Sequence, residues 1–133
     1  VVCLGRRASD ERFTEGLWRQ KTEIRREGKL LWHEQTVLAG GSPLLDSAVG
    51  MAGEPVTGSL IWAGPPLPQE ITDACRALRV EGRLAVTQLP DVWVARYLGP
   101  GSEAAQTALR QVWALVRPAA LGREAVAPRI WAT

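Results

Sequence analysis

The chain of 133 residues is 46% hydrophobic and carries 16 basic against 14 acidic side chains. This length allows one domain with a true hydrophobic core, and the near balance of charge excludes the concentrated positive surface of a nucleic-acid-binding protein. Two cysteines, Cys3 and Cys75, form neither a disulfide framework nor a zinc-binding CxxC pair. Because the sequence has no secretory leader pattern and no apolar run of about twenty residues, we expect a soluble, cytoplasmic protein that does not enter a membrane.

Residues 1–4 form a short apolar strand that starts without an initiator Met and without a polar entry segment. Native N-termini usually begin exposed and polar. We therefore expect a single region over residues 1–133 that is the C-terminal part of a longer protein.

Residues 17–26 alternate between two kinds of side chain, which is the period of a half-buried strand. Glu27 and Gly28 follow as a two-residue turn. Such a turn predicts a hairpin in which Arg26 pairs with Lys29.

A straight register from this turn sets the cross-strand pairs and the two faces of the hairpin. The pairs expected to lie opposite each other are Lys21 with Glu34, Thr22 with His33, and Trp18 with Val37. The face expected to be buried holds Trp18, Ile24, Leu31 and Val37. The other face, solvated or open to a partner protein, holds Arg19, Lys21, Arg25 and Glu34.

Residues 40–62 combine several glycines and two prolines with large apolar side chains. A flexible linker would lack the apolar groups. This stretch therefore predicts a compact crossing segment that leads into a central strand at 55–63.

The second half of the chain predicts two helices around a second hairpin. Residues 69–79 show the apolar spacing of one helix face. Strands are expected at 84–89 and 92–98, both apolar on both faces and therefore inside a sheet stack. A second helix over 102–116 is capped by Ser102 and ends before Pro118, and the tail after it is apolar enough to dock. The whole is a mainly β architecture of stacked sheets with two attached α-helices.

Signatures of catalysis are absent from the sequence. An enzyme needs a poised acid, base, nucleophile or metal, and the chain has a single histidine and no GxSxG, Walker or GxGxxG motif. Asp46, beside Ser47 in a turn-rich segment, is typical of a backbone cap rather than an acid. We expect a protein that is not an enzyme, with an unrelated hydrolytic β-domain as the opposing hypothesis.

The donors that could ligate a soft or borderline metal ion are His33, Cys3 and Cys75. His33 lies mid-strand, where a hydrogen-bonded structural histidine is the simpler interpretation. Cys75 falls on the apolar stripe of its helix and behaves there as a small hydrophobe. The sequence therefore predicts no preformed metal site, and His33 and Cys3 remain the only weak candidates for ligands.

An ordered set of segments nearly from end to end resembles the C-terminal half of urease accessory protein D, the UreD or UreH family. The segments are CLGRRASDERFTEG at 3–16, REGKLLWHE at 26–34, GSPLLDSAVGMAGEPVTGSL at 41–60, LPDVWVARYLG at 89–99, WALVRP at 113–118 and PRIWAT at 128–133. The resemblance implies a layered β-helical fold with two helices. It also implies a nickel-insertion chaperone that binds the urease apoprotein and accessory proteins F and G.

In this interpretation no cofactor is permanently bound, and Ni²⁺ is transient cargo that passes through an internal channel. Oxygen donors suit the exchangeable passage of a hydrated cation better than thiolates, which would hold it. The matched polar positions expected to line the channel are Glu11, Glu34, Asp46 and Ser47; the alternative is that they satisfy loop backbone groups. The residues expected to bind a partner protein are Arg19, Lys21 and Arg25. The alternative function is a metallochaperone that holds nickel directly by His33 and a cysteine.

Overall fold

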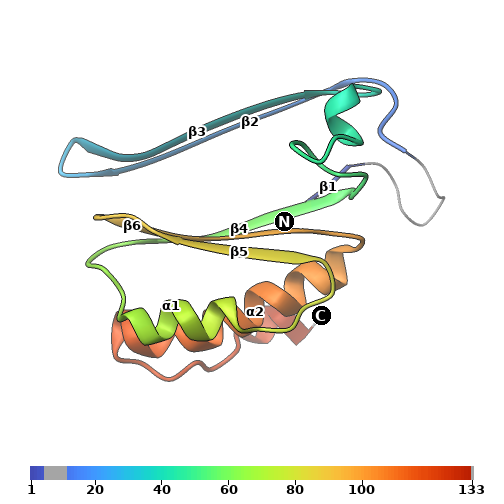
Figure 1. Cartoon of the computed structure of the whole chain (residues 1–133). Coiled ribbons are helices and arrows are strands. Elements are labelled where there is room, and N and C mark those ends of the chain that lie inside the picture. The colour runs from blue at the N-terminus through green and yellow to red at the C-terminus, as the bar shows by residue number, and fades with distance from the viewer. Residues whose placement is uncertain (5–11, 133) are drawn as a thin grey trace.

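The computed structural model describes residues 1–4 and 12–132, which form three layers (Figure 1). The middle layer is an antiparallel sheet with the strand order β1-β4-β6-β5. Its strands are β1 (Val2–Cys3), β4 (Val56–Ala63), β5 (Arg83–Gln88) and β6 (Val92–Gly99). The helices α1 (Gln69–Arg76) and α2 (Ser102–Leu121) cover one face of this sheet.

The third layer is a hairpin of β2 (Leu17–Arg26) and β3 (Lys29–Ala39), which lies over the other face of the sheet (Figure 1). The short 3-10 turns η2 (Pro43–Leu45) and η3 (Arg129–Ala132) lie in the connection from β3 to β4 and near the C-terminus. The mainly β, layered architecture with two helices is confirmed. Both sheets are open and antiparallel.

The main core lies between the middle sheet and the helices. Strand β6 runs between two neighbours under this cover, so Trp93 and Ala95 are fully buried and pack with Val112 of α2. The Trp93 indole donates a hydrogen bond to Thr72 Oγ1 at 3.1 Å, which satisfies both buried polar groups. Cys75 is also fully buried, as its place on the apolar stripe predicted, and burial raises the pKa of its thiol.

The two helices differ from the predictions in their ends and in one cap, and the strand bounds differ by one residue or two. The first helix ends at Arg76, and Leu78 still packs on the core after the helix has ended. The second helix is not capped by the Ser102 side chain; its N-cap is Gly101, with no side-chain cap. It also runs through Pro118 to Leu121, although the proline has no N–H to donate to the preceding turn, and Gly122 in the left-handed conformation ends it.

Strand β5 is an edge strand, and its residues alternate between exposed and covered. The prediction that both strands of this hairpin are buried on both faces is therefore right for β6 and wrong for β5. The guanidinium of Arg76 donates to the carbonyl oxygen of Val86 at 3.1 Å through Nη2. This contact from α1 covers part of the β5 edge, which would otherwise be open to strand pairing.

The turn of the long hairpin forms as predicted, but the register does not. Glu27 (φ +50°) and Gly28 (φ +80°) both have positive φ, as a type I′ turn requires, and Arg26 pairs with Lys29. A β-bulge then shifts the register, so that Ile24 pairs with Trp32. The observed pairs are Lys21 with Gln35, Thr22 with Glu34, Glu23 with His33, and Trp18 with Leu38.

This one-residue shift exchanges the two faces of β3. Side chains alternate along a strand, so an extra residue turns every later side chain to the opposite side. Val37, predicted to be buried, is 50% exposed, and Leu38 is 5% exposed instead. Glu34 leaves the charged outer face for the face that looks toward the middle sheet, so its predicted pairing with Lys21 is wrong.

Candidate functional site

A cleft of about 630 Å³ separates the hairpin from the middle sheet. The hairpin wall is polar in its centre, where two cross-strand pairs lie side by side: Gln20 with Thr36, and Thr22 with Glu34. The sheet wall adds Thr57, Ser59, Ile61 and Arg96. Apolar residues of the connection from β3 to β4 line the end nearest that connection: Leu44, Val49 and Met51. The cleft is therefore polar at its centre and apolar at that end.

An ion pair crosses this cleft. Arg96 Nη2 of β6 donates to Glu34 Oε1 of β3 at 2.9 Å. The same guanidinium lies 5.5 Å from the ring centroid of Trp32, within the range of a cation–π contact. The Glu34 side chain is 26% exposed and that of Arg96 is 52% exposed, so the pair is partly solvated. One carboxylate thus lies in the cleft with a cation already held against it.

Two further polar contacts tie the tip of the hairpin to the sheet. Arg26 Nη2 donates to the carbonyl oxygen of Ala63 at 2.8 Å, and Lys29 Nζ lies 3.4 Å from Asp91 Oδ2. The hairpin is thus fastened at its tip and at Glu34, and the cleft lies along the rest of its inner face.

The structure does not bring the four expected channel residues together. Glu34 lines the cleft. Asp46 is exposed and lines a separate depression beside Leu4 and Pro55. The Ser47 hydroxyl accepts a hydrogen bond from the backbone N–H of Val49 at 3.3 Å. Glu11 lies outside the described residues.

The three expected partner-binding residues, Arg19, Lys21 and Arg25, all lie exposed on the outer face of β2. Glu23 shares this face and lies 2.9 Å from Lys21 Nζ and 3.8 Å from Arg25 Nε. The hydrogen bond and charge of Lys21 lower the pKa of the Glu23 carboxyl. The outer face is therefore basic, with one carboxylate held between two of its cations.

The candidate metal ligands lie in different layers. His33 is exposed on the hairpin opposite Glu23, Cys3 is exposed on β1, and Cys75 is buried under the sheet. Among the described residues, no group of three or more His, Cys, Asp or Glu side chains is placed to hold a metal ion.

The sequence-based reasoning missed Arg96. Arg96 is the single charged residue in the otherwise apolar strand Val92–Gly99. A lone charge in a strand buried on both sides needs a partner, and that signal marks it as a residue that reaches another layer. The partner itself lies 62 residues away in the sequence.

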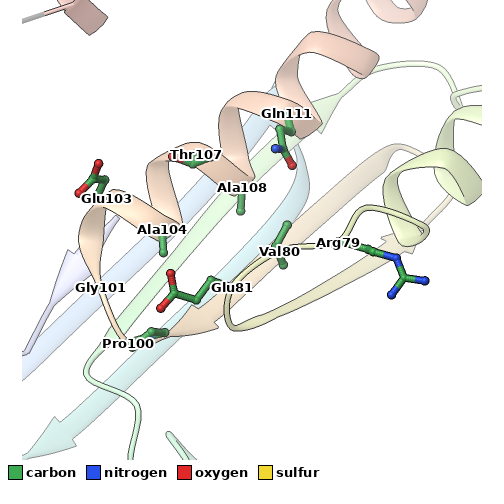
Figure 2. Close-up of a pocket in the computed structure, with 10 residues that line it drawn as sticks. All are labelled: Arg79, Val80, Glu81, Pro100, Gly101, Glu103, Ala104, Thr107, Ala108 and Gln111. Carbon is green, nitrogen blue, oxygen red and sulfur yellow. The ribbon is translucent and has the colours of Figure 1, made fainter.

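A second groove, of about 560 Å³, lies on the helix side of the molecule (Figure 2). The first half of α2 forms one side and the segment 79–81 forms the other, with Ala104 and Ala108 facing Val80. Glu81 and Glu103 lie near one end of it and Arg79 toward the other (Figure 2). This groove contains none of the residues expected from the sequence to act in binding or transport.

Within the described ranges, none of the helices combines the length and the apolar character needed to cross a membrane.

Comparison with known proteins identifies the family. Residues 1–132 match the model of the UreD urease accessory protein family. The whole chain is 48% identical to the urease accessory protein UreD of Nitrosococcus oceani, covering 45% of that protein. It is 42% identical to the UreD of Methylobacillus flagellatus and 47% identical to that of Pseudomonas fluorescens, covering 47% of each. The chain thus spans about half the length of the curated relatives it matches. It belongs to the UreD urease accessory protein family, a family of accessory proteins rather than enzymes.

Proposed function

We propose that this chain is part of a urease maturation chaperone that binds the urease apoprotein together with accessory proteins F and G and assists nickel insertion. The observation that carries the proposal is the family match over residues 1–132. The cleft between the hairpin and the middle sheet supports such a role, because it offers a partly polar concave surface of about 630 Å³ between two layers.

We propose further that the cleft between hairpin and sheet guides Ni²⁺ during this transfer. The cleft supports this because its centre is lined by hydroxyl, amide and carboxylate oxygens. These donors bind a hydrated divalent cation weakly enough to release it. Glu34 is the carboxylate of this lining, and a cation that enters must compete with Arg96 for it. A divalent cation competes with Arg96 for the Glu34 carboxylate more strongly than a monovalent cation or a neutral solute, so the pair would favour passage of divalent cations.

The outer face of the hairpin is the surface that we assign to a partner protein. Its cations Arg19, Lys21 and Arg25 are exposed on one side of a single strand. Together they outnumber the one carboxylate of this face, Glu23, and a surface with a net positive charge steers the encounter with an acidic partner.

Direct storage of nickel by His33 and a cysteine is the weaker alternative. His33 faces outward from the hairpin, and Cys3 lies exposed on β1 in a different layer. Cys75 lies under the sheet with a raised thiol pKa. A protonated thiol is a poor metal ligand.

Capture of the urease apoprotein by the full-length protein tests the chaperone proposal. The wild-type protein should co-purify with the apoprotein or with accessory protein F. Reversal of the three outer charges (Arg19→Glu, Lys21→Glu and Arg25→Glu together) should weaken at least one of these complexes. The matched control reverses three exposed arginines on other surfaces: Arg79, Arg83 and Arg123. Failure of the wild-type protein to capture either partner would overturn the assignment.

Activation of urease in a reconstituted system with nickel tests the role of the cleft. Glu34→Gln removes the charge from the inner face of the hairpin and should slow activation while partner capture stays intact. Glu70→Gln makes the same change at an exposed position of α1, away from the cleft and from the partner face, and serves as the control. Equal activation by Glu34→Gln and wild type would remove Glu34 from the nickel path.

A further inference from the structure

Strand β4 has an edge that only a short stretch of the described chain covers. On one side β6 pairs with it from Val56 to Ala63. On the other side β1 reaches only Val56 and Thr57. Beyond Thr57 this side of β4 is the edge of the middle sheet in the part of the chain that the structure describes.

Two contacts show which backbone groups of β4 point toward this edge. The N–H of Leu4, just after β1, donates to the carbonyl oxygen of Pro55 at 2.8 Å. At the other end of β4, the carbonyl oxygen of Ala63 accepts a hydrogen bond from the Arg26 side chain. Backbone groups of alternate residues face the same side of an antiparallel strand. The odd-numbered residues therefore face the edge.

Ser59 and Ile61 are the two edge-facing residues between these contacts that β1 does not reach. The alternation gives each of them an N–H and a C=O that point to the edge, while Leu60 and Trp62 direct theirs to β6. An exposed row of this kind is the surface to which a further strand adds.

An apolar groove of about 460 Å³ lies directly beside this edge on the helix side. Its apolar lining consists of Val1, Leu60, Leu109, Trp113 and Trp131. Trp131 is held there by an edge-on contact with Trp113, with ring centroids 4.9 Å apart, and by Arg110, which donates to the Trp131 carbonyl oxygen at 2.9 Å. The groove is positioned to receive a side chain that projects from a strand opposite Leu60.

Val1 already occupies the start of this groove. A Cβ built on Gly58 would lie 3.2 Å from Val1 Cγ2 and 3.1 Å from Leu109 Cδ1, so the Val1 side chain fills the space over Gly58 beside α2. The first residue of the chain thus makes, at one position, the kind of contact that a longer strand would repeat at Leu60.

We propose that a further extended strand, in line with β1, pairs antiparallel with β4 through Ser59 and Ile61 and places an apolar side chain in the groove opposite Leu60. The strand comes from the part of the full-length protein outside this chain. Two relatives contain enough additional sequence for such a strand, because the matched region covers only 45% and 47% of their length. A second copy of this chain could pair with only a few residues of this edge, because β1 already pairs with Thr57 and the Arg26 side chain already bonds to the carbonyl oxygen of Ala63. This inference does not depend on the proposed function.

Hydrogen exchange at single-residue resolution in the full-length protein tests the proposal. The amides of Ser59 and Ile61 should exchange at least roughly 100-fold more slowly than in an unstructured peptide. The amides of Leu60 and Trp62, which bond to β6, are internal controls for the integrity of β4. Rapid exchange at Ser59 and Ile61 beside protected Leu60 and Trp62 would overturn the proposal.

The source of the strand is tested by the same measurement. Protection that is independent of protein concentration and of added proteins supports a strand of the same chain. Protection that disappears on dilution identifies a second copy, and protection that appears only with an added partner identifies that partner; either result overturns the source proposed here. Ser59→Pro removes an edge donor without removing a bond to β6, and should lower protection at Ile61 but not at Trp62. Ser59→Ala is the matched control and should leave both unchanged.

Discussion

At the scale of single residues, Arg96 joins two layers that otherwise meet through few polar contacts. Its guanidinium binds the Glu34 carboxylate and lies over Trp32, so one side chain combines an ion pair with a cation–π contact. Both interactions are partly solvated, and such pairs contribute modestly to stability. The pair matters more for where it places Glu34 than for the free energy it supplies.

A double-mutant cycle on Arg96→Met and Glu34→Gln in the full-length protein measures that contribution. We expect a coupling free energy of about 0.5–1 kcal/mol, from denaturant unfolding, because the pair is short but partly exposed. The Lys29–Asp91 pair is longer, at 3.4 Å, and more exposed, so its cycle should give a smaller coupling. A larger coupling for Lys29–Asp91 would contradict this assignment.

Tyr97 predicts a change in stability at high pH. Burial and the charges of Glu81 and Glu54 raise the pKa of Tyr97, whose hydroxyl donates to the Glu81 carbonyl oxygen at 2.8 Å. In the unfolded chain the phenol ionises near pH 10. The stabilisation is therefore complete below about pH 10 and decreases as the pH rises toward the higher folded pKa.

The Tyr97→Phe protein should lose about 1 kcal/mol at neutral pH with the hydrogen bond. It should also show a weaker loss of stability above pH 10 than the wild type, in urea unfolding at each pH. If the free energy of unfolding falls equally with pH in both proteins, ionisation of Tyr97 does not cause the loss of stability above pH 10.

At the scale of elements, the hairpin shows which features the periodicity of the sequence predicts and which it does not. The alternation of residues 17–26 and the Glu27–Gly28 turn predicted the first strand and its turn correctly. The bulge was not predictable, because Leu30, Leu31 and Trp32 are three successive large apolar residues that suit either register. The register is set by contacts outside the hairpin, because with the bulge Leu38 is buried and Glu34 pairs with Arg96.

Replacement of Glu27 tests the energetics of this turn. Glu27 has φ +50°, a conformation that non-glycine side chains adopt at a cost. Asn tolerates this region better, and Asn-Gly is the preferred type I′ pair. Glu27→Asn should therefore raise the free energy of unfolding by about 0.5 kcal/mol or more, whereas Gly28→Ala, at φ +80°, should lower it by about 1 kcal/mol. Thermal unfolding of both variants checks the opposite signs, and equal shifts would exclude a type I′ turn.

At the scale of the whole molecule, the three layers are held together by different forces. The sheet and the helices share an apolar core that includes Trp93 and Val112. The hairpin is fastened to the same sheet by ionic and polar contacts around a cleft, and its inner face is polar at the centre. The sequence predicted that sheets stack, but not which polar residues meet between them. Glu34 and Arg96 lie 62 residues apart, and only the completed layers bring them together.

This difference predicts that the hairpin opens as a separate unit in the full-length protein. Amides that bond between β2 and β3 should exchange faster than those that bond between β4 and β6, since the inner face of the hairpin buries Leu38 but is polar at its centre, whereas β4 and β6 lie over the apolar core. Added salt should increase the difference between the two exchange rates. The screening length falls from about 8 Å at physiological ionic strength to about 3 Å at 1 M. The ion pairs of Lys29 and Arg96 then weaken, while the burial of Trp93 and Val112 is unaffected.

Arg96→Met should make amide exchange in the hairpin faster at low salt and less dependent on salt. If both layers instead exchange at one rate that salt does not change, the hairpin and the core form a single cooperative unit, and the cleft cannot open by movement of the hairpin alone.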